Sequence, residues 1–514
     1  MQSTEVLIIG AGPTGLTLAC SLAAHNVPVR VIDGASGPAA TSRANILHAR
    51  GVEVLDRMGA LNGLHEQALA PLGMAMHVQG RPLATMRFAP VDGESVQALF
   101  VSQASVESGL RRRLSELGTE VEWGTRLTDL EQDGDGLTAG FASGTRLRAA
   151  WAVGCDGAHS TVRGRTGIEF PGVPVVEQFL LADVRARWDR DRSTSAGWFH
   201  RDGILLAIPM RGIGEKTREG GDLWRLMADI PAPAADERLD ERQIIDRFEQ
   251  IIPARAGDGG VKIRGAEWTS VFRIHRRLAA DYRRGRVLLA GDAAHIHSPI
   301  GGQGMNTGIG DAENLGWKLA LVTAGRAGIG LLDTYTAERR PLATEVLAGT
   351  TANTKILVGE RAVTRVVRDR LFVPLLNLPA VQRNATRTAS QLWVTYRKGP
   401  LGASSRGRGP HAGDRVPDLD CRRADGTRTR LHAELGCAWA LLLPPAVTDP
   451  GALLAAAREY LGGHVTVLRP HEPAAEGVVM LVRPDGHLGW QGPPAAPHLT
   501  RWLTRVLGCG QAQV

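Results

Sequence analysis

The chain has 514 residues, 43% of them hydrophobic and 22% charged, which is too long for one ordinary domain and fits a globular protein with a sizeable core. No apolar run approaches the roughly 18 residues of a membrane span, and the N-terminal segment lacks the basic lead of a signal peptide, so we expect a cytoplasmic protein. The net charge of +7 is spread among interspersed acidic residues, which disfavours a nucleic-acid-binding face.

The N-terminal segment predicts a β-α-β unit. Residues 5–9 form a continuous apolar run typical of a strand buried on both faces. A helical pattern over 13–25 and a second strand over 27–33 follow. A parallel sheet is expected from this order.

The rest of the chain predicts a second sheet, long helices and a separate C-terminal segment. We read residues of roughly 170–272 as a sheet-rich domain inserted into the first, and the Gly, Ser and Pro-rich stretch 398–413 as a linker. The expected strands are 120–123, 136–142, 151–153, 179–184, 203–209, 223–230, 286–290, 438–443, 465–468 and 477–482, and the expected helices are 105–117, 240–251, 305–324 and 333–360.

The first glycine motif follows the first strand. Gly10 permits a tight turn, Gly12 lets the backbone approach a pyrophosphate, and Gly15 allows close helix–strand packing. Asp33 ends the next strand, near the spacing of a carboxylate that holds a ribose hydroxyl. This context favours dinucleotide binding over a glycine-rich turn without a ligand.

Two further motifs place an aspartate directly after an apolar strand. One contains Asp156 in GCDGAHSTVR, and the other contains Asp292 in GDAAH and continues to residue 306. Glycines near a helix start expose backbone N–H groups that can stabilise negative charge. The three motifs therefore predict one nucleotide-cofactor site.

Simpler readings of the same residues compete with this one. Asp292, His295 and His297 could form a metal cluster, but no further ligands gather nearby, so we predict no metal site. Asp156, His159 and Ser160 are too crowded in sequence for a hydrolytic triad. Five aromatic residues could line a substrate pocket or form the core of the inserted sheet, and both readings stay open: Trp198, Phe199, Trp224, Trp268 and Phe272.

The three motifs together resemble the group A flavoprotein monooxygenases of the para-hydroxybenzoate hydroxylase fold, and most closely the aromatic polyketide hydroxylases. The resemblance covers residues 3–395 and, more faintly, the tail. It implies an α/β fold in which an FAD-binding Rossmann-like domain carries an inserted β-sheet substrate domain and a C-terminal thioredoxin-like domain. The implied domains are 1–175 (FAD-binding, with about 73–100 contributing to the substrate domain), 176–274 (substrate), 275–397 (FAD-binding) and 414–514 (thioredoxin-like).

The resemblance also implies which residues bind the cofactor. Gly10, Gly12 and Gly15 would hold the FAD pyrophosphate, Asp33 the adenosine ribose, and Asp292 the ribityl chain. The full implied set is Gly10, Gly12, Pro13, Thr14, Gly15, Asp33, Arg43, Gln103, Leu127, Asp156, Asp292, Pro299, Gly302, Gly304, Met305 and Asn306. The tail carries no Cys-x-x-Cys pair, so we expect no disulfide chemistry there.

The implied reaction is a monooxygenation. NADPH or NADH would reduce FAD, O₂ would form a flavin C4a-hydroperoxide, and an electron-rich aromatic substrate, polyketide- or antibiotic-like, would be hydroxylated. Two alternatives remain: Baeyer–Villiger insertion beside a polycyclic ketone, and a non-oxygenating FAD oxidoreductase. The sequence names no catalytic base and leaves monomer and homodimer open.

Overall fold

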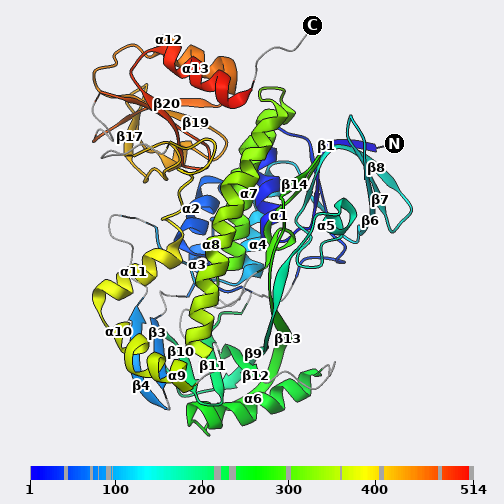
Figure 1. Ribbon diagram of the computed structural model, residues 1–514, viewed down its shortest axis with the longest axis vertical. Helices are drawn as coiled ribbons and strands as arrows, with labels where there is room; N and C mark the ends of the chain where they lie inside the picture. The colour runs from blue at the N-terminus through cyan, green and yellow to red at the C-terminus, as the bar shows by residue number, and fades with distance from the viewer. Residues whose placement is uncertain are drawn as a thin grey trace.

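The computed structural model describes residues 2–39, 44–69, 73–78, 80–87, 94, 96–212, 222–230, 239–296, 302–358, 362–403, 410–472 and 477–508. Three sheets and two long central helices organise them (Figure 1). Within these residues, no helix combines the length and apolarity that a bilayer crossing requires. The four described cysteines are free thiols.

The first sheet is built on the predicted β-α-β unit. Its strands are β1 (Gln2–Ile9), β2 (Val29–Ile32), β5 (Val121–Glu122), β6 (Leu127–Gln132), β7 (Leu137–Phe141), β8 (Arg146–Gly154), β14 (Arg283–Arg284) and β15 (Val287–Leu289). The main order is β14-β15-β8-β1-β2-β5, with β6 and β7 attached to β8 as an antiparallel meander. Because β1 is buried from Val6 to Ile9, its continuous apolar run is explained. The Rossmann-like prediction is confirmed.

The second sheet corresponds to the sheet-rich domain that the sequence predicts for residues of roughly 170–272. Its strands are β3 (Gly73–Val78), β4 (Arg81–Arg87), β9 (Gly172–Arg187), β10 (Thr194–His200), β11 (Gly203–Pro209), β12 (Leu223–Ile230), β13 (Lys262–Leu278) and β16 (His295–Ile296). They follow the order β16-β13-β9-β12-β11-β10-β3-β4. The long strands β9 and β13 run through residues 175 and 274, where two domain boundaries are predicted. The boundaries stay a prediction.

The third sheet forms the C-terminal part. Its strands are β17 (Asp420–Arg423), β18 (Arg428–Arg430), β19 (Trp439–Leu442), β20 (Val465–Pro470), β21 (Val479–Val482) and β22 (Leu488–Gly492). The strand β19 pairs in parallel with β20 and antiparallel with β21, which forms a hairpin with β22. A β-α-β unit followed by a hairpin and a final helix is the thioredoxin-like arrangement that we predicted.

The helices pack between and around the sheets. They are α1 (Pro13–Ala24), α2 (Ala49–Arg57), α3 (Leu64–Gln67), α4 (Gln103–Glu116), α5 (Thr161–Thr166), α6 (Glu241–Ala256), α7 (Gln303–Thr323), α8 (Asp333–Val358), α9 (Ala362–Val367), α10 (Val373–Leu375), α11 (Pro379–Ser390), α12 (Gly451–Leu461) and α13 (Ala496–Leu507), with short helical turns η1 (Gly291–Ala293), η2 (Ile329–Leu332), η3 (Arg368–Phe372) and η4 (His432–Glu434). Pro13 begins α1, where its missing N–H costs nothing, and Asp240 forms a capping box before α6. Figure 1 shows α7 and α8 running through the middle of the molecule, with the third sheet at one end and the second sheet at the other.

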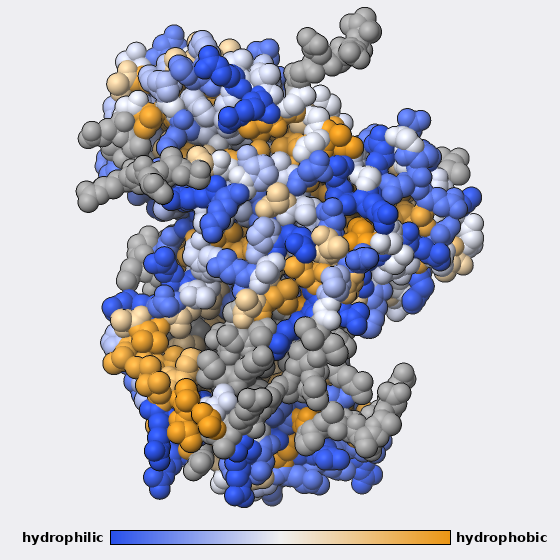
Figure 2. Space-filling view, in the orientation of Figure 1, coloured by the Kyte–Doolittle hydropathy of each residue, from blue (hydrophilic) through white to orange (hydrophobic). Residues whose placement is uncertain are grey.

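One exposed apolar stripe stands out on the surface. It consists of Val363, Val366, Val367, Leu371, Leu375 and Leu378, which are 40% to 74% exposed and follow helical spacing from α9 through η3 and α10 to the residue before α11. Figure 2 shows this patch beside the second sheet. A contiguous apolar patch of this kind marks a contact surface more often than scattered apolar residues do.

Candidate active site

Four parallel strands end side by side at one edge of the first sheet. Ile9 of β1 pairs with Ile32 of β2 and with Gly154 of β8, and Gly154 also pairs with Leu289 of β15. The three glycine-bearing motifs and Asp33 directly follow these strand ends. Ligands of open α/β sheets bind at such carboxyl ends. The sequence motifs therefore meet at one edge, as expected.

In the first glycine loop, Gly10 and Gly15 are packed tightly against neighbouring backbone, whereas Gly12 borders open space. Gly10 has a φ of +108°, and a Cβ added there would lie 2.3 Å from the carbonyl oxygen of Cys155. A Cβ at Gly15 would lie 2.0 Å from the oxygen of Gly10. A Cβ at Gly12 would meet nothing within 4 Å. The open space at Gly12 is the place that a pyrophosphate would need.

The third motif packs against the start of α1. A Cβ added to Gly291, whose φ is +61°, would lie 2.5 Å from Oγ1 of Thr14. A Cβ added to Gly308 of α7 would lie 2.2 Å from the same atom. Only glycine permits this approach. Thr14, next to Pro13, is thus the point where the first motif, the third motif and α7 touch.

Two helix N-termini at this edge are without a capping side chain. Gly12 precedes α1, and Gly302, with a φ of +63°, precedes α7. Gly304 and Met305 lie in the first turn of α7. Uncapped N-terminal N–H groups and the positive end of the helix dipole attract anions. The arrangement fits the pyrophosphate of FAD at α1 and the polar edge of its ring at α7.

Asp33 organises the loops around it. Its carboxylate accepts hydrogen bonds from the N–H groups of Ala11 and Ala35, both at 2.8 Å. Its carbonyl accepts one from Thr125, also at 2.8 Å. Leu127 begins β6 two residues later. The chain around Asp33 and the chain that leads to Leu127 are therefore adjacent.

The aspartates of the second and third motifs have different surroundings. Asp156 accepts a 2.5 Å hydrogen bond from the hydroxyl of Ser160 and a 2.7 Å one from the N–H of Thr161, at the start of α5. Asp292 is exposed and makes no hydrogen bond or ion pair with the part of the chain that the structure describes. The carboxylate of Asp156 thus stabilises a helix start, whereas that of Asp292 is available to a ligand.

Gln103 and Asn306 hold the segment 44–48. The Oε1 atom of Gln103 accepts a 3.2 Å hydrogen bond from the N–H of Ala44. The amide of Asn306 accepts one from the N–H of His48 at 2.8 Å and donates one to the carbonyl of Ile46 at 3.1 Å. Asn306 therefore fixes this segment against α7.

A cavity of about 630 Å³ lies beside this segment. Small-molecule sites typically measure about 300–1,000 Å³. Its wall includes Asn45, and the Nδ2 atom of Asn45 is buried with no hydrogen-bond partner among the described residues. The wall consists of Asn45, Glu66, Gln67, Leu69, Phe100, Val101, Ser102, Ala104, Ser105, Ser108, Ile208, Pro209, Met210, Arg211 and Gly212. The cavity therefore lies between the start of α4 and the end of β11.

The simpler readings can now be compared with the structure. His295 is fully buried and hydrogen-bonded to Asp311 at 2.6 Å, so its imidazole belongs to the core. The hydroxyl of Ser160 donates to Asp156 and accepts the N–H of Arg163, as a helix cap does. The five aromatic candidates do not line the cavity described above, and three of them are core residues: Trp198, Phe199 and Trp224. The calls on Arg43, His297 and Pro299 fall outside the described residues.

Two positioning residues were missed by the motif analysis. The guanidinium of Arg163 donates to the carbonyls of Ala293 and Ala158, at 2.8 and 2.9 Å, and so joins the second and third motifs. Asp311 of α7 accepts the N–H of Gly291 at 3.1 Å. An arginine inside the second motif and an aspartate in the middle of a buried helix were visible signals, but their partners were not.

Comparison with known proteins identifies this arrangement. A family model described as "FAD binding domain" matches residues 3–350, and one described as "Aromatic-ring hydroxylase, C-terminal" matches residues 409–509. The chain belongs to the FAD-binding aromatic-ring hydroxylases. It is an FAD-dependent monooxygenase.

Relatives resemble this aromatic-ring hydroxylase along its whole length. Rifampicin monooxygenase from Streptomyces venezuelae is 36% identical, over 97% of this chain and 97% of the relative. The structure of OxyS anhydrotetracycline hydroxylase from Streptomyces rimosus has 33% identity and a TM-score of 0.81, covering 99% of this chain and 100% of that one. A ternary complex of aklavinone-11 hydroxylase with FAD and aklavinone has 26% identity and a TM-score of 0.80, covering 99% of both chains.

Proposed function

We propose that this hydroxylase consumes NADPH or NADH and inserts one oxygen atom into an electron-rich, fused polycyclic aromatic substrate. The observation that carries the proposal is the 630 Å³ cavity beside the segment that Gln103 and Asn306 hold. The names of the relatives, which refer to rifampicin, anhydrotetracycline and aklavinone, support this substrate class. When bound and reduced, FAD would supply the two electrons that activate O₂, of which one oxygen atom enters the substrate and the other leaves as water.

The chain's own residues would bind the cofactor, orient the substrate and shield the reacting atoms from water. The loop from Gly10 to Gly15, with Pro13 and Thr14, would hold the pyrophosphate, Asp33 the ribose, and Leu127 the adenine through its backbone. Arg43 would lie on the path of the nicotinamide. Asp156 would support the adjoining loop, and the stretch from Pro299 to Asn306 would line the flavin ring. The apolar residues of the cavity wall, which include Leu69, Phe100 and Ile208, would limit the access of water to the reacting atoms.

Asp292 provides a first test of the FAD site. We expect Asp292→Ala to raise the dissociation constant of FAD roughly 10- to 100-fold, because a hydrogen bond to a charged group contributes about 1.5–3 kcal/mol. The melting temperature without FAD should not change, since this carboxylate is exposed and has no partner among the described residues. Fluorescence titration of FAD measures the first effect. Unchanged affinity would remove Asp292 from the site.

Asn45 provides a test of the substrate cavity. Its buried Nδ2 atom has no partner in the described chain, so a substrate oxygen would gain a hydrogen bond there. We expect Asn45→Ala to raise KM about tenfold while kcat and FAD content stay near wild type. Asn62→Ala, in an exposed turn, is the matched control. A loss of FAD without a change in KM would instead assign Asn45 to the cofactor.

The reaction itself is tested with a panel of fused aromatic substrates. Hydroxylation predicts substrate-stimulated NADPH oxidation, equimolar O₂ uptake and a product that gains one oxygen atom on a ring carbon. The same gain within a ring-expanded ester would establish Baeyer–Villiger insertion. NADPH oxidation without oxygen incorporation into any substrate would contradict the proposal.

A further inference from the structure

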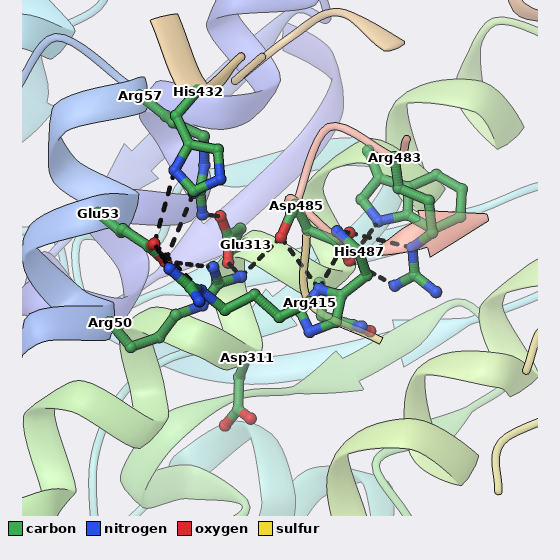
Figure 3. A network of polar contacts seen from close by, with 12 residues as sticks. Arg50, Glu53, Arg57, Asp311, Glu313, Arg415, His432, Arg483, Asp485 and His487 are labelled. Atoms are coloured by element: carbon green, nitrogen blue, oxygen red, sulfur yellow. Dashed lines mark hydrogen bonds and ion pairs between the residues drawn. The ribbon is translucent and has the colours of Figure 1, made fainter. Parts of the chain in front are cut away.

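The turn between β21 and β22 lies in the interior of the protein, although it belongs to the C-terminal part. Its residues Arg483, Asp485 and His487 are each 1% exposed. Loops of this kind usually run over the surface. Figure 3 shows that this turn faces charged residues of α2 and α7. We call it the β21–β22 turn and follow its contacts in two directions.

The first direction leads to α8. Arg483 donates to both carboxylate oxygens of Glu338, at 2.9 and 3.0 Å. The ring of His487 lies 4.3 Å from the ring of Tyr396, measured between centroids. The hydroxyl of Tyr396 accepts a 3.0 Å hydrogen bond from Arg339. The β21–β22 turn therefore contacts Arg339 indirectly, because His487 packs against Tyr396 and Tyr396 binds Arg339.

Arg339 also reaches the third motif. It donates a 2.7 Å hydrogen bond to Oδ1 of Asp311, whose Oδ2 accepts the N–H of Gly291 at 3.1 Å. Burial alone would raise the pKa of Asp311, but Arg339 and His295 hold it below its usual value, so this carboxyl is ionised. The turn that presents Asp292 thus rests on a buried, charged relay.

The second direction leads to α2. The carbonyl of Asp485 accepts a 2.6 Å hydrogen bond from Arg50, which also binds Glu313 of α7 at 2.8 Å (Figure 3). Arg50 lies in the first turn of α2, two residues after His48, whose N–H is bound by Asn306. The same turn therefore supports both of the loops that flank the expected flavin position.

We propose that the β21–β22 turn is a positioning element of the FAD site, which sets the loop of Asp292 through Tyr396 and Arg339. The C-terminal part then contributes to cofactor binding without touching the cofactor. Buried ionic networks cost desolvation and are weak stabilisers, but they can specify one arrangement of the groups they join. The predicted effect on FAD binding rests on the proposed function, whereas the predicted effect on the opening of the loop of Asp292 does not.

The test compares three variants of the full chain without FAD. Tyr396→Phe removes one hydroxyl from the relay, and Asp485→Asn removes the negative charge of the β21–β22 turn. Leu468→Ala is the control, because Leu468 is fully buried in a core confined to the C-terminal part and takes no part in the relay. Hydrogen–deuterium exchange of residues 287–296 reports on the loop, and fluorescence titration reports on FAD.

We expect both relay variants to exchange this peptide at least about tenfold faster and to bind FAD roughly five- to tenfold more weakly, which is less than one direct hydrogen bond to a charged group because the relay acts through other residues. Leu468→Ala should lower the melting temperature at least as much and leave both readouts at wild type. Equal effects of Leu468→Ala would overturn the inference, as would wild-type exchange in Tyr396→Phe. Faster exchange in a chain that binds no FAD even as wild type would retain the relay and contradict the proposed function.

Discussion

Gly12→Val should abolish tight FAD binding and leave the free chain folded. The backbone at Gly12, with a φ of −75° and a ψ of −178°, is accessible to any residue, and a Cβ there meets nothing within 4 Å. The valine side chain would occupy the space in which phosphate oxygens must come within about 3 Å of the helix N–H groups. We expect the dissociation constant of FAD to rise at least about 100-fold, or about 2.7 kcal/mol.

Two other glycines separate this effect from general damage. Gly265→Val, at an equally open and exposed position on β13, should change neither FAD affinity nor stability. Gly10→Ala should instead destabilise the free chain, because its φ of +108° and the 2.3 Å approach to Cys155 both exclude a side chain. Titration with FAD and thermal unfolding without FAD distinguish the three. Wild-type affinity in Gly12→Val would show that the pyrophosphate lies elsewhere.

Local sequence patterns were sufficient for the first β-α-β unit, the long central helices and about half of the strands. The apolar run 5–9 and the glycines that follow it need only their neighbours in the chain to be interpreted, and β1 and α1 occur where they were expected. Strand β13 was missed because its pairing with β9 shifts register at three places, and each shift interrupts the alternation that marks a strand. Strand β10 was missed as well, although it forms a tight antiparallel hairpin with β11 in addition to its parallel pairing with distant β3.

In the candidate site, too, the features that depend on neighbouring residues were predictable and those that depend on distant residues were not. Glycine requirements are local, so the three motifs were readable, whereas Arg163 acts on a carbonyl 130 positions away. The relay was not predictable because interspersed charges indicate solvated surface, whereas the packing of the C-terminal part brings Asp485 to Arg50 and Arg483 to Glu338. Asn45 gave no signal in the sequence, because its role comes from its place in the wall of the cavity.

Glu338→Gln should lower the free energy of unfolding by about 3–5 kcal/mol, the usual cost of removing one member of a buried ion pair. Glu338 is buried and accepts hydrogen bonds from Lys318 at 2.8 Å and from Arg483 at 2.9 and 3.0 Å. Its replacement would leave two buried cations with less compensation. Glu345→Gln, on an exposed position of the same helix, should change stability by less than about 0.5 kcal/mol.

The same carboxylate predicts a pH dependence. Burial alone would raise the pKa of Glu338, but Arg483 and Lys318 lower it to about 2, from 4.5 in an ordinary glutamate. Between these two values the unfolded chain binds a proton at Glu338 that the native chain does not. The contribution of Glu338 to the free energy of unfolding is therefore fully present above pH 4.5 and is lost as the pH decreases toward 2. Urea unfolding of wild type and Glu338→Gln across this window measures the difference, which should shrink as the pH decreases. A difference that stays constant from pH 7 to pH 3 would mean that Glu338 is not held ionised by its two cationic partners, and would reassign the loss in Glu338→Gln to packing alone.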